Sequence, residues 1–289
     1  MSELVQLLVA GVTVGIIYAT IAVGYATIYS ATGVISFTLG AQAMVSGYLF
    51  YVVLAPWPPL PSAVASVALG AITSLALWIV VFEPIFRREG AMPTVIASFA
   101  VSVVMQETVR ILASADVRAA PSPFGESILR IRGVAITAHT LGTIAMAGIL
   151  LAAVGLAFRS RRALLVKAIF QDRMMAQALG VKDSMIINLI FLVSGAATAV
   201  AGVLLAPLSS LTPFTGVYIA LVGFVGATLG GITGVAASAL GAILLGVVQS
   251  LFAGYVSASY TNALVFGVLA VVLILKPSGL LTTHERARV

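Results

Sequence analysis

The sequence predicts an all-α membrane protein, a polytopic bundle with about eight or nine hydrophobic segments and a helix on the cytoplasmic face. Apolar side chains make up 61% of the 289 residues and charged ones only 8%. The mean hydropathy is +1.17, whereas soluble domains carry about 25% charged residues. Charged residues are also absent from Leu4 to Phe82 and from Ser184 to Leu275. A transmembrane β-barrel would alternate polar and apolar residues, so these uninterrupted stretches predict helices.

Glycine, proline and charged residues divide the apolar sequence into stretches of about 20 residues, the length of a spanning helix. The predicted spans are residues 4–29, 34–54, 61–82, 92–113, 138–158, 185–206, 216–232, 235–255 and 260–276. The stretch 216–232 is short and rich in glycine, which is also typical of a half-helix or a re-entrant segment. Nine full spans put the N-terminus outside the cell and eight put it inside; we favour nine.

Basic residues predict which loops face the cytoplasm. The stretch from Arg159 to Asp183 carries six basic and two acidic residues between two apolar spans. Counting spans from this stretch also places Arg87, Arg88 and the tail that begins at Lys276 inside. The loop from Ser114 to Thr137 has nearly balanced charges and falls outside. This distribution follows the membrane rather than a nucleic acid, so no nucleic-acid partner is expected.

Small residues recur at every fourth position near the C-terminal third. Gly226, Gly230 and Gly234 are followed by Ser238 and Ala242. This spacing predicts one smooth helical face, and in lipid such faces allow two helices to pack closely. Three roles remain open for it: packing within the subunit, a subunit interface, or a gate at which helices slide.

The sequence after the first span mixes hydroxyls, glycines and an amide into apolar surroundings. Irregular backbone at membrane depth occurs only where protein or a water-filled cavity covers it, so such a break is typical of a substrate path. In that case Ser36, Phe37, Thr38 and Gln42 are the residues expected to line the path. A tight cytoplasmic hairpin between two spans is the alternative.

Groups for catalysis, metal binding or ion coupling are scarce. Cysteine is absent, and His139 and His284 are far apart, so neither a catalytic residue nor a metal site is predicted. Glu107 and Arg110 are the charges well inside a predicted span, three residues apart, and we expect them to pair on one helix face. Energy for transport is therefore expected to come from another protein.

The cytoplasmic stretch at about 163–182 has apolar residues at spacings of three and four, which predicts an amphipathic helix. Gly180 suits its C-terminal cap. The apolar face would lie either on lipid headgroups or in a groove of a soluble partner. The spacing alone does not choose between them.

A resemblance favours the partner. Ala176–Gly180 resembles the Ala-x-x-x-Gly core of the coupling segment in permease subunits of ABC importers, although Met174 stands where many of them have glutamate. The stretches Gly11–Tyr25, Leu229–Ile232 and Lys276–Leu280 look like the permeases of branched-chain amino acid importers. This similarity extends in order over essentially the whole chain.

The resemblance implies that residues 1–289 form a single transmembrane permease domain in a bacterial inner membrane. It implies four partners besides lipid: a second permease subunit, usually a paralogue, two cytoplasmic ATPase subunits and a periplasmic solute-binding protein. The chain has no GxxxxGK[ST] loop, so ATP and magnesium are expected on the ATPases, and no cofactor or enzymatic activity on this chain. The implied coupling residues are Gln171, Asp172, Arg173, Ala176, Leu179 and Gly180.

One departure from the family concerns the substrate. The break after the first span usually reads like Asn-Phe-Ala-His-Gly followed by an acidic residue, whereas this chain has Ser36–Ala41 without histidine or carboxylate. Branched-chain or other hydrophobic amino acids remain the expected substrates, with another small nutrient as an alternative. A stand-alone secondary carrier for a small organic solute is the rival function. An intramembrane enzyme is disfavoured because His, Asp and Glu are so few.

Overall fold

The computed structural model describes residues 2–53, 56–113, 122–125, 127–131, 134–160, 165–166, 168–169, 175, 183–209, 212–276 and 279–281. Its helices are α1 (Ser2–Thr32), α2 (Thr38–Tyr48), α3 (Pro59–Leu77), α4 (Glu83–Glu89), α5 (Ala91–Ala113), α6 (Ala138–Arg159), α9 (Asp183–Leu205), α10 (Thr215–Gly230), α11 (Val235–Tyr255) and α12 (Thr261–Leu275). Two π-helical turns, η1 (Leu49–Val53) and η2 (Trp78–Phe82), extend α2 and α3.

The all-α membrane class is confirmed. Six helical stretches of the described chain are long and apolar enough to cross a bilayer: Glu3–Thr32, Pro59–Glu89, Ala91–Leu112, Ala138–Arg159, Asp183–Leu205 and Val235–Tyr255. The shorter apolar helices are α10 and α12. Each predicted span coincides with one of these helices or with α2 and η1. The short glycine-rich stretch is α10, with 16 residues.

Two differences from the sequence prediction concern the loops. Helix continues without a break through α3, η2 and α4 to Glu89, so Arg87 and Arg88 lie on a helix rather than in the turn. The predicted outer loop contains a two-stranded antiparallel hairpin, β1 (Ile128–Ile131) and β2 (Val134–Thr137). Both strands are rich in branched apolar residues, which favour extended backbone.

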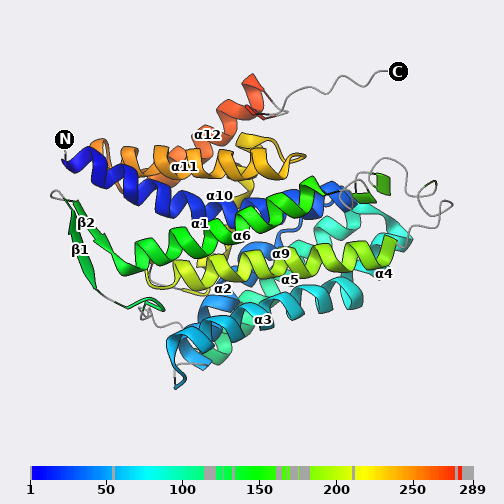
Figure 1. Cartoon of the computed structure of the whole chain (residues 1–289). Coiled ribbons are helices and arrows are strands. Elements are labelled where there is room, and N and C mark those ends of the chain that lie inside the picture. Colours follow the sequence, from blue (N-terminus) through cyan, green and yellow to red (C-terminus); the bar gives the residue numbers. More distant parts are fainter. Residues whose placement is uncertain are drawn as a thin grey trace.

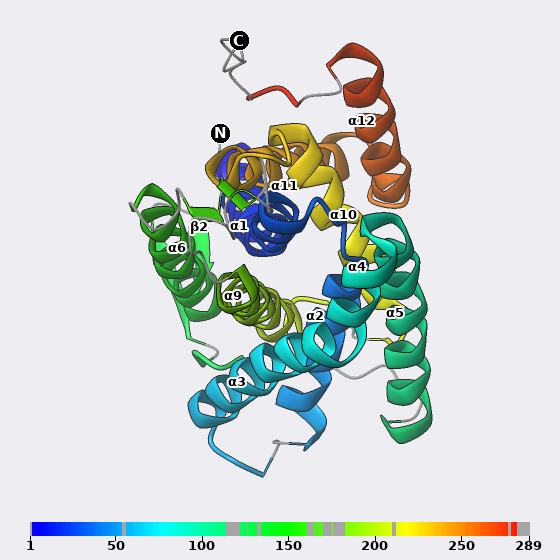
Figure 2. The same cartoon turned by 90° about the vertical axis from the view of Figure 1, so that its right-hand side faces the viewer.

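Helix α1 forms the centre of the bundle. Viewed end-on in Figure 2, α6, α9, α10 and α11 surround it, whereas α3, α5 and α12 lie farther out. Ile17, Ile21 and Ile28 are fully buried on α1. The close packing of α1 against α11 depends on glycine, because a Cβ atom on Gly246 would overlap the backbone of Gly15. Contact between two such backbones replaces side-chain packing, as is usual in lipid.

The basic regions share one end of the bundle. Arg159 ends α6 beside the turn between α10 and α11, and the Leu280 N–H donates to the Leu229 carbonyl at the end of α10 (2.8 Å). Arg87 lies near Ser184 at the start of α9. The N-terminus and the β-hairpin lie at the opposite end (Figure 1). By the positive-inside rule the basic end is expected to be cytoplasmic, and the N-terminus is then expected outside.

At the opposite end, His139 joins three parts of the chain. Its Nδ1 lies 3.0 Å from the Ser122 hydroxyl and its Nε2 lies 3.1 Å from the Leu204 carbonyl of α9. The Phe124 ring lies over Gly142, one turn further along α6, where a Cβ atom would overlap it. These contacts hold the segment that precedes the β-hairpin against α6.

Candidate functional site

The chain between α1 and α2 turns back into the bundle. Gly33 ends α1 with φ of 68°, a left-handed conformation that glycine adopts at little cost, and its N–H donates to the Tyr29 carbonyl (2.9 Å). Residues 33–36 are non-helical, yet Val34 and Ser36 are almost completely buried, with 1% and 2% of their surface exposed. We call residues 33–37 the return loop.

Contacts of Phe37 and Leu39 show that the return loop reaches into the bundle. The Phe37 ring lies 6.5 Å from that of Phe224 in α10, and Phe224 in turn lies 6.0 Å from Tyr25. Leu39, in the first turn of α2, lies beside Gly24, about two helical turns before the end of α1, because its Cδ1 atom would be 3.5 Å from a Cβ atom on Gly24. Irregular backbone therefore lies inside the bundle, and a tight hairpin at the cytoplasmic surface does not describe it.

Polar groups cluster where α2 begins. The hydroxyls of Ser36 and Thr38 lie 2.7 Å apart, and the Phe37 N–H donates to the Ser98 hydroxyl of α5 (3.0 Å). Gln42 is 3% exposed, and its Oε1 atom is buried without a hydrogen-bond partner in the described part of the chain. Buried amide oxygens normally have a partner, so Gln42 retains the capacity to accept a hydrogen bond from a bound molecule or water.

Two glycines hold α2 tightly between its neighbours. A Cβ atom on Gly40 would come within 2.5 Å of the Ala220 backbone nitrogen in α10 and would overlap the Gly216 carbonyl. On the other side, a Cβ atom on Gly202 of α9 would overlap the carbonyl of Ala43. The helix that carries Thr38 and Gln42 therefore has no free space toward either neighbour.

Sequence reasoning missed the residues that surround Phe37. Its ring contacts Phe99 edge-on (6.3 Å, 86°) as well as Phe224, and its backbone contacts Ser98. Phe99 is 58% exposed, so the aromatic cluster extends from the centre of the bundle to its surface at α5. These residues lie in ordinary apolar spans, and nothing in their spacing distinguishes them from residues that face lipid.

The glycine repeat does not follow one helical face, because α10 ends at Gly230 and α11 begins after Gly234. The chain folds back instead. A Cβ atom on Gly226 would come within 2.7 Å of Ala242, and one on Gly230 would lie against Ser238 of α11. Gly234 is the residue that precedes α11, so the repeat places small residues on both arms of a helical hairpin.

The predicted coupling residues Gln171, Asp172, Arg173, Ala176, Leu179 and Gly180 lie outside the described residues. Described positions of the same segment are helical. Val166 and Ile169 are buried, whereas Leu165 and Met175 are exposed. The spacing of three between the buried residues is that of a helix with one face packed against the bundle.

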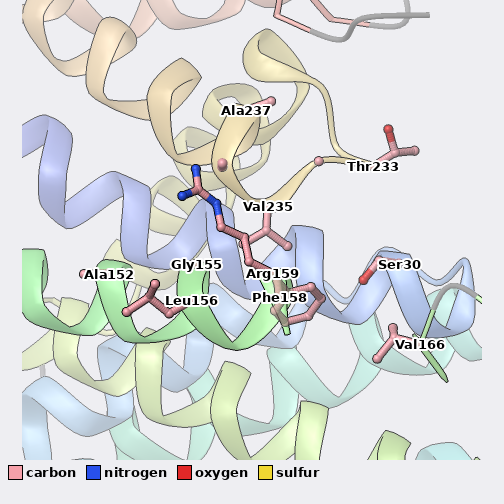
Figure 3. A pocket seen from close by; sticks show the side chains of 12 residues that line it. Ser30, Ala152, Gly155, Leu156, Phe158, Arg159, Val166, Thr233, Val235 and Ala237 are labelled. Carbon is pink, nitrogen blue, oxygen red and sulfur yellow. The ribbon is translucent and has the colours of Figure 1, made fainter. Parts of the chain in front are cut away.

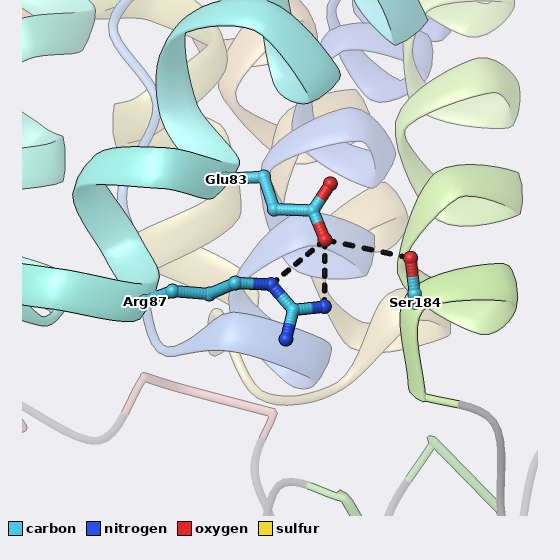
Figure 4. Close-up of polar contacts among 3 residues, drawn as sticks. All are labelled: Glu83, Arg87 and Ser184. Carbon is cyan, nitrogen blue, oxygen red and sulfur yellow. Dashed lines mark hydrogen bonds and ion pairs between the residues drawn. The ribbon is translucent and has the colours of Figure 1, made fainter.

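A polar contact connects α4 to the first turn of α9, directly after this segment. Figure 4 shows Glu83 between Arg87 and Ser184: its Oε1 atom lies 2.7 Å from Arg87 Nη2 and 3.4 Å from the Ser184 hydroxyl. One turn earlier, Trp78 of η2 stacks on Phe191 of α9 at 4.4 Å. These two contacts join α9 to η2 and α4.

The expected pairing of Glu107 with Arg110 is confirmed. Arg110 Nε lies 2.6 Å from Glu107 Oε2, and both side chains are nearly half exposed. This ion pair lies on the outer surface of α5, away from the return loop.

Comparison with known proteins places this geometry in a family. Residues 7–274 match the model of the permease component of the branched-chain amino acid transport system. The chain is 28% identical to the high-affinity branched-chain amino acid transport system permease protein BraD of Pseudomonas aeruginosa, over 98% of this chain and 97% of BraD. It is 27% identical to the permease protein LivH of Escherichia coli K12, over 96% of each chain. No solved structure matches.

A more distant relative extends this set. The probable branched-chain amino acid transport permease protein LivH of Methanocaldococcus jannaschii is 23% identical, over 90% of this chain and 87% of the relative. The family model covers nearly the whole bundle, from the first turns of α1 to the end of α12. The chain therefore belongs to the family of permease components of branched-chain amino acid transport systems, multi-pass membrane subunits that transport without catalysing a reaction.

Proposed function

We propose that this chain, acting as a single permease domain over residues 1–289, forms part of the path by which an ABC importer moves branched-chain or other hydrophobic amino acids across the inner membrane. The return loop is the observation that carries the proposal. It brings Ser36, Phe37 and Thr38 inside the bundle, next to the buried and unpartnered oxygen of Gln42. Such irregular backbone inside a membrane protein is typical of a substrate path.

The composition of this region suits an amphiphilic solute. Phe37, Phe99 and Phe224 offer aromatic surface for an aliphatic side chain. The hydroxyls of Ser36 and Thr38 and the amide of Gln42 offer hydrogen bonds for an amino or carboxylate group. None of these six residues is charged. They can therefore bind a zwitterionic amino acid without attracting one of its charged groups and repelling the other.

Energy enters from ATPase subunits through the segment at about 163–182. By the sequence pattern, Ala176 and Leu179 are assigned to its apolar ridge, Gly180 to its cap and residues 171–173 to its polar edge. Closure of two ATPases around ATP would move this segment and the attached start of α9. Phe191, which stacks on Trp78, would then pass the movement to η2 and to α4, which continues from it. The resulting rocking of the spans alternates access to the path.

A second permease subunit, a paralogue of this chain, completes the path, and a periplasmic binding protein supplies the solute. The first of these partners is supported by Phe99, which contacts Phe37 of the return loop and is also exposed on the outside of α5. Ile96 next to it is 69% exposed, so α5 presents a continuous apolar face beside the return loop. A path that opens between two subunits requires such a face on each of them.

The test is leucine uptake by proteoliposomes that contain this chain, its companion permease and the ATPases, with the binding protein added outside. We expect Phe37→Ala to lower uptake about tenfold, because it removes two aromatic contacts, and Gln42→Ala to lower it as well. Phe266→Ala on α12, where the ring is 56% exposed, is the matched control and should leave uptake unchanged. Normal uptake kinetics in both path variants would remove these residues from the path.

Two further measurements separate the proposed function from its rival. Gly180→Pro or Ala176→Arg should leave ATP hydrolysis running while uptake stops, because the coupling helix is broken or its ridge is charged. Liposomes with this chain alone should take up no leucine against its gradient. Uphill uptake without the ATPases would overturn the proposal in favour of a stand-alone carrier.

A further inference from the structure

A groove opens at the cytoplasmic end of α6, away from the return loop. Its volume is about 570 Å³. One wall is the last two turns of α6, and the facing wall is the turn between α10 and α11 with the first turn of α11 (Figure 3). Ser30 of α1 and Val166 lie at its far side. The proposed amino acid path does not use this groove.

The groove has a cationic mouth. The Arg159 side chain extends across it toward Val235 and Ala237 of α11 in Figure 3, and Arg159 forms no ion pair with any described residue. Thr233 adds a hydroxyl on the facing wall. The first turn of α11 adds positive potential, because Gly234 precedes it without a side-chain cap. An anion therefore finds a cation and hydrogen-bond donors from two separate elements.

The remainder of the groove is apolar and continues along the outside of the bundle. Ala152, Gly155 and Leu156 line it from α6. Ile149 does not line the groove, but it precedes Ala152 by three and Leu156 by seven residues, so it lies on the same side of α6, closer to the middle of the helix. Ile149 is 72% and Leu156 66% exposed, since α6 lies at the edge of the bundle in Figure 2. A molecule in the groove therefore has an apolar track that leads from its charged group toward the centre of the membrane.

We propose that this groove binds an anionic phospholipid of the cytoplasmic leaflet, with its phosphate at Arg159 and an acyl chain along Ala152, Leu156 and Ile149. Charge and polarity select this occupant. Arg159 opens the most basic stretch of the sequence, on the side where the leaflet carries anionic lipids. Basic pockets between transmembrane helices on that side bind lipid headgroups, and guanidinium is well suited to phosphate. A free phosphate would leave the apolar track empty.

The bound lipid connects elements that otherwise share few contacts here. It bridges the end of α6 and the turn between α10 and α11, next to the point at which the Leu280 and Leu281 N–H groups pair with the end of α10. Occupancy of the groove should therefore raise the thermal stability of the chain in anionic lipid. This inference depends on the orientation given by the basic loops and is independent of the substrate.

The test measures lipid retention by the full-length chain in detergent micelles, using native mass spectrometry. Dioleoyl-phosphatidylglycerol is the probe, dioleoyl-phosphatidylcholine the zwitterionic comparison, and inorganic phosphate the competitor. We expect phosphatidylglycerol to remain bound when phosphatidylcholine is lost, and phosphate not to displace it. Displacement by inorganic phosphate alone, or equal retention of both lipids, would overturn the proposal.

Two pairs of variants locate the binding. Arg159→Gln should weaken phosphatidylglycerol retention about fivefold, the effect of one basic residue at an anionic surface, whereas Arg88→Gln at the same end should not. Gly155→Leu should fill the groove, because a Cβ atom there meets nothing within 4 Å. Gly267→Leu on α12, where a Cβ atom also meets nothing within 4 Å, is its control.

Each outcome with these variants bears on the proposal. Selective loss in Arg159→Gln and Gly155→Leu supports it. Equal loss in Arg159→Gln and Arg88→Gln would indicate general surface charge, and unchanged retention in Gly155→Leu would exclude the groove. Either result overturns the proposal, as would cross-linking of Gly155→Cys to a protein partner in membranes that contain phosphatidylglycerol. Transport activity enters none of these measurements, so failure of the proposed amino acid function would not affect them.

Discussion

Gly40→Ala should destabilise the bundle although alanine is the better helix former. Its Cβ atom would lie 2.5 Å from the Ala220 backbone nitrogen, whereas ordinary carbon contacts need about 3.5 Å, so α2 and α10 must separate by about 1 Å. Movement of α2 the other way is blocked where Gly202 lies against Ala43. Overpacking of this kind costs about 1–3 kcal/mol, and the helix preference of alanine returns about 0.5–1 kcal/mol.

Combining these two terms, we expect a net loss of about 0–2.5 kcal/mol in the free energy of unfolding, with a central value of about 1 kcal/mol. The assay is a reversible denaturant titration in mixed micelles, followed by the fluorescence of the two tryptophans. Gly148→Ala is the control, because a Cβ atom there meets nothing within 4 Å, and it should stabilise by about 0.5–1 kcal/mol. Equal stability of the two variants would refute the close approach of α2 and α10.

Three other experiments test separate contacts. Tyr25→Phe should cost about 1 kcal/mol in the same titration, because it removes the O–H that donates to the Ala220 carbonyl (3.2 Å) while the ring still contacts Phe224. A double-mutant cycle of Glu83→Gln with Ser184→Ala should give less than about 0.5 kcal/mol, because their 3.4 Å contact is long; a larger value would contradict this geometry. His139→Ala should release residues 122–125, detected as faster proteolysis there; unchanged proteolysis would contradict the contacts of His139.

The spans could be predicted from the sequence because bilayer thickness fixes helix length and charged residues interrupt the apolar stretches. The predicted 235–255 coincides with α11, and 92–113 differs from α5 by one residue at its start. The predicted span ends at residue 82, before the charged residues Arg87 and Arg88, whereas helix continues to Glu89. Charge marks the edge of the membrane, not the end of a helix, and the i,i+4 pair of Glu83 with Arg87 supports helix beyond that edge.

The contacts of the candidate path could be predicted only in part. Ser36, Thr38 and Gln42 stand out in sequence because polar side chains are rare in apolar surroundings. Phe99 and Phe224 do not, because lipid and the interior of a membrane protein favour the same apolar side chains. The surface of a span that faces a partner helix therefore has the same composition as the surface that faces lipid. Phe99 and Phe224 are distinguished only by their contacts with Phe37 in the folded chain.

The glycine repeat shows why spacing alone misplaces such contacts. Four-residue spacing describes one face only where helix continues, and glycine is also the residue that ends a helix with positive φ. Gly231 has φ of 118°, so the chain leaves α10 at that point and returns as α11. Gly226 then faces Ala242 and Gly230 faces Ser238, across a turn at Gly234. Small residues at equal distances on either side of a break in the helix therefore predict a close helical hairpin rather than a single smooth face. In this chain the first helix of the hairpin, α10, also carries Phe224, whose ring lies next to Phe37 of the return loop.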